Sequence, residues 1–216
     1  MKKLIIISIA VLCSMAAYAQ SEFGIRGGAN MASIIKTVIS FKDANSGLSV
    51  NHNPGFAGYA GVYGQTDLSD LIGVRAELDY SANSSAIPAD ILFALTGRVS
   101  DIKCYDIIHT LSLPLLVTFS SSSDRLHFMV GPQLGYNFSE SLRSVGSKES
   151  FTEQLHHEYI KPFVLSAAVG ASYLLGESLG VEFRYSHGIT PIRNGKALLN
   201  AGRQTTMQIG VFYNFM

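Results

Sequence analysis

Eight segments in which apolar and polar residues alternate, joined by connections that are short and long in turn, constrain the fold of this chain most. The segments are residues 22–32, 54–65, 71–82, 105–119, 126–139, 159–174, 179–189 and 204–215. Short connections (65–70, 120–125 and 175–178) alternate with long ones (33–53, 83–104, 140–158 and 190–203). A period of two residues is typical of β-strands, and this order of connections is typical of barrels with short periplasmic turns and long outer loops. The pattern predicts an all-β fold: an eight-stranded antiparallel up-and-down transmembrane β-barrel with both termini periplasmic.

The two faces of these segments favour a membrane barrel over a soluble, lipocalin-like one. One face carries no charge, and aromatic residues gather near the segment ends, as expected at two membrane interfaces. They are Phe23, Phe128, Tyr213 and Phe215 toward one rim, and Tyr80, Tyr136, Phe138 and Tyr185 toward the other. A soluble barrel would expose Lys or Glu on most strands, whereas the polar face here is mostly Gly, Ser, Thr, Asn and Gln. Glycines leave the phase of 54–65 and 159–174 open.

The N-terminus has the features of a cleavable export signal. Two lysines precede an apolar core at residues 4–12, and Ala17-Tyr18-Ala19 is a small-x-small cleavage site. That core is too short to cross a bilayer as a helix, which takes about 20 residues. The residues before Cys13 lack the small side chain that a lipoprotein signal places there, so no lipid anchor is expected. The predicted domains are therefore a signal peptide at 1–19 and an outer-membrane barrel domain at 20–216.

The C-terminus has the pattern that the barrel-assembly machinery of Gram-negative bacteria reads in a last strand. Gln208 is followed by a glycine at 210 and by aromatic residues at 213 and 215. We predict that Gln208, Gly210, Tyr213 and Phe215 form this assembly signal. The predicted partners are thus outer-membrane lipid and the assembly machinery.

Composition narrows the class further. No apolar run after the signal reaches 18 residues, which excludes a helical membrane protein. The net charge is zero, so neither a nucleic-acid partner nor electrostatic attachment to anionic lipid is implied. Cleavage would leave Cys104 as the single cysteine, so no intrachain disulfide is expected.

Several short motifs resemble one known family of barrels. They are Phe23-Gly24-Ile25-Arg26-Gly27-Gly28-Ala29-Asn30, Arg75-Ala76-Glu77-Leu78-Asp79-Tyr80-Ser81, Leu113-Pro114-Leu115-Leu116, Gly131-Pro132 and Arg184-Tyr185-Ser186-His187-Gly188. Together they are similar to the PorT-type small outer-membrane barrels of Bacteroidetes, although Ser112 replaces the family's usual acid and Met216 follows the final aromatic. The resemblance implies an outer-membrane location and suggests a role in protein secretion, which the founding member of the family serves.

Six charged residues on the polar face form the main candidate site. Three arginines balance three acids, and all six should lie at similar depth: Arg26, Arg75, Glu77, Asp79, Glu182 and Arg184. The interior of an eight-stranded barrel is just wide enough to be filled by side chains, and unpaired charges there would be costly. We expect a paired network that rigidifies the barrel; a proton or ion path is the alternative.

Other candidate chemistry has a simpler interpretation. His156 and His157 with Glu153 and Glu158 could suggest zinc, but adjacent residues rarely bind one metal without further fixed ligands. Ser186 and His187 are neighbours on a strand and point to opposite faces, so they cannot form a catalytic pair. The apolar stretch 88–95 suits a short helix that packs within its loop. No catalytic residue, cofactor or metal is predicted.

These features predict a non-catalytic outer-membrane protein with a structural or adaptor role, with protein partners at its loops or periplasmic turns. A narrow porin-like channel for small solutes is the alternative. An enzyme acting on outer-membrane lipid comes third, and would require a Ser–His pair at one depth on one face.

Overall fold

The computed structural model describes residues 21–35, 37–40, 47–87, 103–121, 125–145, 150–154, 160–193, 199–200 and 202–215. Eight strands form the wall of a barrel: β1 (Ser21–Ile35), β4 (Asn53–Asp67), β5 (Ile72–Ile87), β6 (Lys103–Ser120), β7 (Leu126–Val145), β9 (Phe163–Leu174), β10 (Leu179–Gly188) and β12 (Arg203–Phe215). Four shorter strands extend from it: β2 (Thr37–Ser40), β3 (Gly47–Val50), β8 (Ser150–Gln154) and β11 (Leu199–Asn200).

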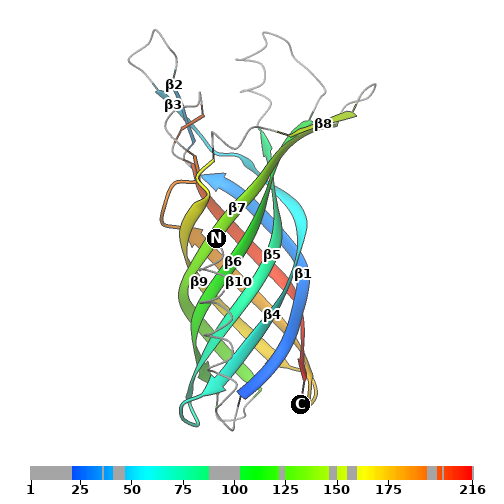
Figure 1. The fold of residues 1–216 in the computed structure, drawn as a ribbon, viewed down its shortest axis with the longest axis vertical. Coiled ribbons are helices and arrows are strands. Elements are labelled where there is room, and N and C mark those ends of the chain that lie inside the picture. Colours follow the sequence, from blue (N-terminus) through cyan, green and yellow to red (C-terminus); the bar gives the residue numbers. More distant parts are fainter. Residues whose placement is uncertain are drawn as a thin grey trace.

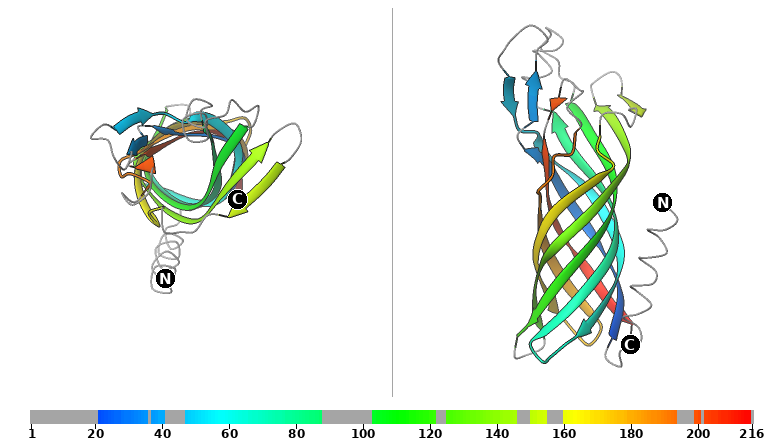
Figure 2. Two further views of the ribbon diagram at one scale, coloured as in Figure 1. Left: turned by 90° about the horizontal axis from the view of Figure 1, so that it is seen from above. Right: turned by 60° about the vertical axis from the view of Figure 1, so that its left-hand side comes forward.

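The barrel is closed, and every neighbouring pair of strands is antiparallel. The order β6-β5-β4-β1-β12-β10-β9-β7 returns on itself through pairing of β6 with β7. The first and last wall strands pair over the whole of β12 and nearly all of β1, from Phe23 opposite Phe215 to Ile35 opposite Arg203. Figure 2 shows the resulting ring from above and the tilt of the strands from the side. Closure leaves no free edge in the wall, which a bilayer requires because lipid offers the backbone no hydrogen-bonding partner.

The two ends of the barrel differ (Figure 1). At one end, here called the turn end, β4–β5, β6–β7 and β9–β10 are joined by short connections, and the C-terminal strand ends. At the opposite end, the loop end, β2, β3 and β8 extend beyond the wall. β8 lengthens the sheet beside the upper part of β7, while β11, β2 and β3 form a separate small sheet.

The predicted architecture is confirmed, with corrections at the loop end. Each of the eight predicted segments lies on a wall strand. β1, β5, β6 and β7 extend up to six residues further into the predicted loops than the alternation indicated, and β8 and the small sheet also lie in them. The sixth wall strand begins at Phe163 rather than at residue 159, since Pro162 precedes it.

The predicted apolar face is the outer surface, and the structure settles the two uncertain phases. Ile209 and Val169, for example, are 64% and 52% exposed on the outside of the wall. In β4 the glycine-rich sequence turns Tyr59 and Tyr63 into the lumen, where they are 5% and 2% exposed. In β9, Ser172 faces inward. A wall with this exposed apolar surface is suited to lipid rather than water.

Two sequence predictions fall on residues that the structure does not describe. They are the signal peptide at 1–19 and the short helix at 88–95. Within the described residues, no helix is long and apolar enough to cross a membrane.

We expect Ile209→Arg to destabilise the folded barrel in lipid by about 2–4 kcal/mol, because it places a charge on the lipid face near the bilayer midplane. Ile209 is in the middle of β12, with Ala29 and Phe183 as its partners on either side. The matched control is Ile189→Arg, because Ile189 is also half-exposed but follows β10 at the loop end. Urea unfolding in lipid vesicles measures both; an equal cost at the two positions would contradict this placement of the membrane.

Candidate functional site: the lumen

All six charged residues predicted to face the lumen meet in one buried cluster, here called the lumen charge network (Arg26, Arg75, Glu77, Asp79, Glu182 and Arg184). Their side chains are at most 3% exposed. Glu77 lies at the centre and accepts hydrogen bonds from Arg26 and Arg184, with 2.8 Å between Arg184 Nη2 and Oε1. Its Oε1 also lies 2.7 Å from Arg75 Nε. One carboxylate therefore contacts all three arginines.

The other two acids complete the network around Arg26. Glu182 accepts hydrogen bonds from Arg26 Nε at 2.6 Å and from the Tyr59 hydroxyl at 2.8 Å. Asp79 accepts one from Arg26 Nη1 at 3.0 Å. Three acids thus balance three bases inside a layer closed to solvent. Removing one partner from such an arrangement leaves an uncompensated buried charge, a change that typically costs 3–5 kcal/mol.

Aromatic rings seal the network on its turn-end side; one of them is Tyr63, on the segment whose phase the sequence left open. The Arg75 guanidinium lies 3.6 Å from the centre of the Tyr63 ring and 5.8 Å from that of Phe212. Both rings lie over glycines of neighbouring strands. A Cβ at Gly24 would be 2.4 Å from Tyr63 Cζ, and one at Gly180 would be 2.2 Å from Phe212 Cζ. These glycines make room for rings that lie flat against the wall.

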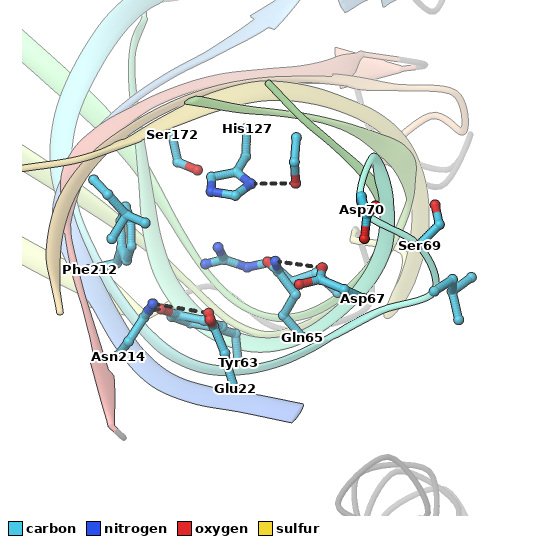
Figure 3. A pocket seen from close by; sticks show the side chains of 14 residues that line it. Glu22, Tyr63, Gln65, Asp67, Ser69, Asp70, His127, Ser172, Phe212 and Asn214 are labelled. Carbon is cyan, nitrogen blue, oxygen red and sulfur yellow. Dashed lines mark hydrogen bonds between the residues drawn. The ribbon is translucent and has the colours of Figure 1, made fainter. Parts of the chain in front are cut away.

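A cavity of about 590 Å³, here called the turn-end vestibule, lies between these rings and the turn end. Figure 3 shows Tyr63, Phe212 and Asn214 on one side and Ser172 and His127 across the lumen. Asn214 accepts a hydrogen bond from the Tyr63 hydroxyl and donates one to Glu22 at 3.1 Å. The lining is polar and carries three exposed carboxylates: Glu22, Asp67 and Asp70.

The vestibule also contains a Ser–His pair that the sequence did not reveal. The Ser120 hydroxyl lies 3.0 Å from His127 Nδ1, and Ser172 is the partner of His127 on the other neighbouring strand. All three line the vestibule at one depth. A histidine at this distance can accept a proton from a hydroxyl, but a serine nucleophile also needs donors for the developing oxyanion. Backbone N–H groups in the wall strands point along the sheet toward neighbouring strands, rather than into the vestibule where an oxyanion donor would have to lie.

A second seal, here called the loop-end plug, closes the lumen at the loop end. Ile192, 1% exposed, packs with three other buried isoleucines, Ile34, Ile108 and Ile160. Its amide donates to the Gly202 carbonyl at 2.8 Å, and its carbonyl accepts from the Lys161 amide at 2.8 Å. A small cavity of about 30 Å³ lies between the plug and the charge network, space for about two waters.

An ion pair fixes the plug to the wall. Arg193 Nη2 donates to Glu140 Oε1 at 2.8 Å and to Asp106 of β6. All three residues are at most 6% exposed. Glu140 lies beyond Phe138, which belongs to an aromatic cluster on the outer face, so the pair is outside the membrane-spanning part of the wall. Burial and the nearby Asp106 carboxylate raise the pKa of Glu140 to about 7. No pattern in the sequence marked Arg193.

Other predicted candidates do not come together. Ser186 faces the lumen and donates to Gln133 at 3.1 Å, whereas His187 contacts Thr205 at 3.1 Å. His156, His157 and Glu158 lie outside the described residues, and the side chain of Glu153 does too. Tyr213 and Phe215 are half-exposed on the outer face, Gln208 faces the lumen, and Phe212 is buried. The assembly signal predicted for Gln208, Gly210, Tyr213 and Phe215 stays a prediction.

Residues 18–194 match the family described as "Outer membrane protein beta-barrel domain", and the chain belongs to that family. The protein is thus a small outer-membrane β-barrel. Solved structures of similar fold include the attachment invasion locus protein Ail of Yersinia pestis (11% identity, 91% of this chain, 99% of that chain, TM-score 0.45). Neisserial surface protein A (14%, 89%, 97%, 0.48) and OprG of Pseudomonas aeruginosa (15%, 91%, 96%, 0.47) are further examples. Comparison with curated proteins gives no match.

We expect Glu77→Gln to destabilise the barrel by about 3–5 kcal/mol, because three buried guanidiniums would lose their shared carboxylate. Combining it with Arg184→Met should cost less than the sum of the two single changes, as expected when the two side chains interact directly. The control Glu22→Gln changes an exposed carboxylate at the vestibule rim and should have a small effect. Urea unfolding in micelles measures all four; additive costs would contradict the network.

We expect the pH dependence of stability to contain a contribution from Glu140. Since folding raises the pKa of this carboxyl to about 7, the folded state holds its proton more tightly than the unfolded state does. Its ionisation therefore lowers stability as the pH rises from about 5 to above 7. Glu140→Gln should remove this loss, whereas Asp67→Asn, at an exposed acid, should keep it. Unfolding measured at pH 5.5, 6.5 and 8 gives the pH dependence of the free energy of unfolding for each protein. The same pH dependence in wild type and in Glu140→Gln would contradict the prediction.

Proposed function

We propose that this protein is a non-catalytic, non-conducting outer-membrane barrel with a structural or adaptor role. The single observation that supports this is the pair of seals in series, the lumen charge network and the loop-end plug. Each occupies the lumen with buried side chains that contact one another directly. A barrel filled in this way has no open path for solutes through its lumen, so its ends and outer wall are the surfaces that partners can contact.

The proposal includes an orientation. The turn end faces the periplasm, so both termini lie on that side, and the long connections face outward; short turns on the periplasmic side are the rule for such barrels. Protein partners would then dock on the outer loops or on the periplasmic turns around the vestibule. The resemblance to PorT-type barrels supports a link to protein secretion. Comparing the secreted and surface proteins of wild-type and deletion strains tests that link.

The narrow-pore alternative makes the opposite prediction for conductance. We expect purified protein in planar bilayers to show no steady channel, because both seals must open before ions can cross. Arg193→Ala, which frees the plug, should stay closed since the charge network remains. Steady, ion-selective channels in the wild type would overturn the proposal and favour the pore. Channels in Arg193→Ala alone would show that the plug is the one effective seal.

An enzyme, the third candidate after the narrow pore, is retained because of one observation, the Ser120–His127 pair in the vestibule. If Ser120 is a nucleophile, a fluorophosphonate probe should label it, and both Ser120→Ala and His127→Ala should abolish labelling. We expect no labelling of the wild type above that of Ser120→Ala; Ser172→Ala, a matched change in the same cavity, is the control that leaves the Ser120–His127 pair in place. Selective, His127-dependent labelling of Ser120 would overturn the non-catalytic proposal.

A further inference from the structure

The net charge of the chain is zero, but the exposed charges of the described residues are unevenly distributed along the barrel. Among the described residues at the loop end, the exposed charges are all basic: Lys103, Arg143 and Arg203. At the turn end most are acidic: Glu22, Asp67, Asp70 and Glu177, with Arg125. The loop-end acids Asp106 and Glu140 are buried and are used by Arg193. Counting the described residues alone, the exposed outer surface of the loop end therefore carries positive charge without acidic partners.

Two of these cations are neighbours on the outer face. Arg143 of β7 is opposite Tyr105 of β6, and Lys103 is two residues further along β6, opposite Val145. Their backbones are thus diagonal neighbours about 7–8 Å apart on one face. Neither cation forms an ion pair with another described residue. Two cations this close repel each other unless an anion lies between them.

An aromatic cluster fixes the depth of this pair. Tyr80, His109 and Phe138 pack on the outer face with ring centres 6.0–6.2 Å apart, and the Tyr80 hydroxyl lies 2.8 Å from His109 Nδ1. Such rings mark a membrane interface. Tyr105, the partner of Arg143, lies on the same face of β6 as His109, four residues nearer the loop end. At the usual rise and tilt of barrel strands, the Arg143 backbone is therefore about 10 Å above the cluster. From there an Arg side chain that reaches downward places its guanidinium in the headgroup layer.

We propose that Lys103 and Arg143 form a clamp for a phosphate group on a glycolipid headgroup of the outer leaflet. A guanidinium presents two parallel donors that match phosphate oxygens, and an ammonium adds a point charge. The apolar wall directly below holds the acyl chains, so a ligand with both a phosphate and a lipid tail fits this surface better than free phosphate. The assignment to the outer leaflet rests on the proposed orientation.

The test compares two ligands that differ only in phosphate. Purified barrel in a neutral detergent is titrated with bisphosphorylated lipid A and with its dephosphorylated form, and bound lipid is counted by native mass spectrometry. We expect wild type to prefer the phosphorylated form by on the order of 30-fold, from about a fivefold effect per cation near a membrane surface for the two cations. K103Q/R143Q should lose that preference. Arg203→Gln, which removes an exposed loop-end cation from β12, should retain it.

Three outcomes would overturn the clamp. They are equal binding of both lipids by wild type, an equal loss in Arg203→Gln, and displacement of lipid A by inorganic phosphate at comparable concentration. A difference in gel mobility between unboiled and boiled samples shows that each variant is folded. Orientation is tested separately, by labelling intact cells at Arg203→Cys in a Cys104→Ser background. An inaccessible cysteine there would refute the proposed orientation, whatever the binding result in detergent.

Discussion

The interior of an eight-stranded barrel must be filled by side chains, yet the strands that enclose it are held by a polar backbone and face lipid outside. At the middle of its lumen this chain places a layer of charge rather than hydrocarbon. Glu77 can be buried because three guanidiniums surround it, and the arginines can be buried because Glu182 and Asp79 complete the balance. The large rings of Tyr63 and Phe212 then fit only because glycines stand opposite them. Both rings pack on Arg75, so this aromatic layer depends on the ionic arrangement above it.

If the proposed function is right, the filled lumen leaves the ends and the outer wall as the surfaces available to partners. The vestibule is polar and open at the turn end, whereas the loop end is closed by the plug and carries exposed cations outside. These two surfaces differ in shape and charge, so they suit different partners. In the proposed adaptor role, the barrel would hold one partner on each side of the membrane without exchanging solutes between the two sides.

Much of the fold was readable from the sequence because lipid enforces strict alternation. A single charge on the outer face would break the pattern, so the phase of β1, β5, β7, β10 and β12 could be assigned, and with it the six network charges. The phase of β4 could not be assigned, because its glycines carry no side chain to show direction, and Tyr59 and Tyr63 suit either face. Arg193 and the Ser120–His127 pair were missed because register and loop return, rather than local spacing, bring these residues to their partners.

Gly210 was predicted as part of a signal read by another protein, but the barrel itself already requires it. A Cβ at this position would lie 2.3 Å from the Gly27 carbonyl oxygen and 2.4 Å from the Tyr59 hydroxyl. A side chain there would push β12 away from β1, at the seam where the chain's last strand meets its first. A genetic screen that finds Gly210 indispensable would therefore report on closure of the seam. Tyr213 and Phe215, which face outward and fill no part of the lumen, are the positions at which recognition by the assembly machinery can be distinguished from folding.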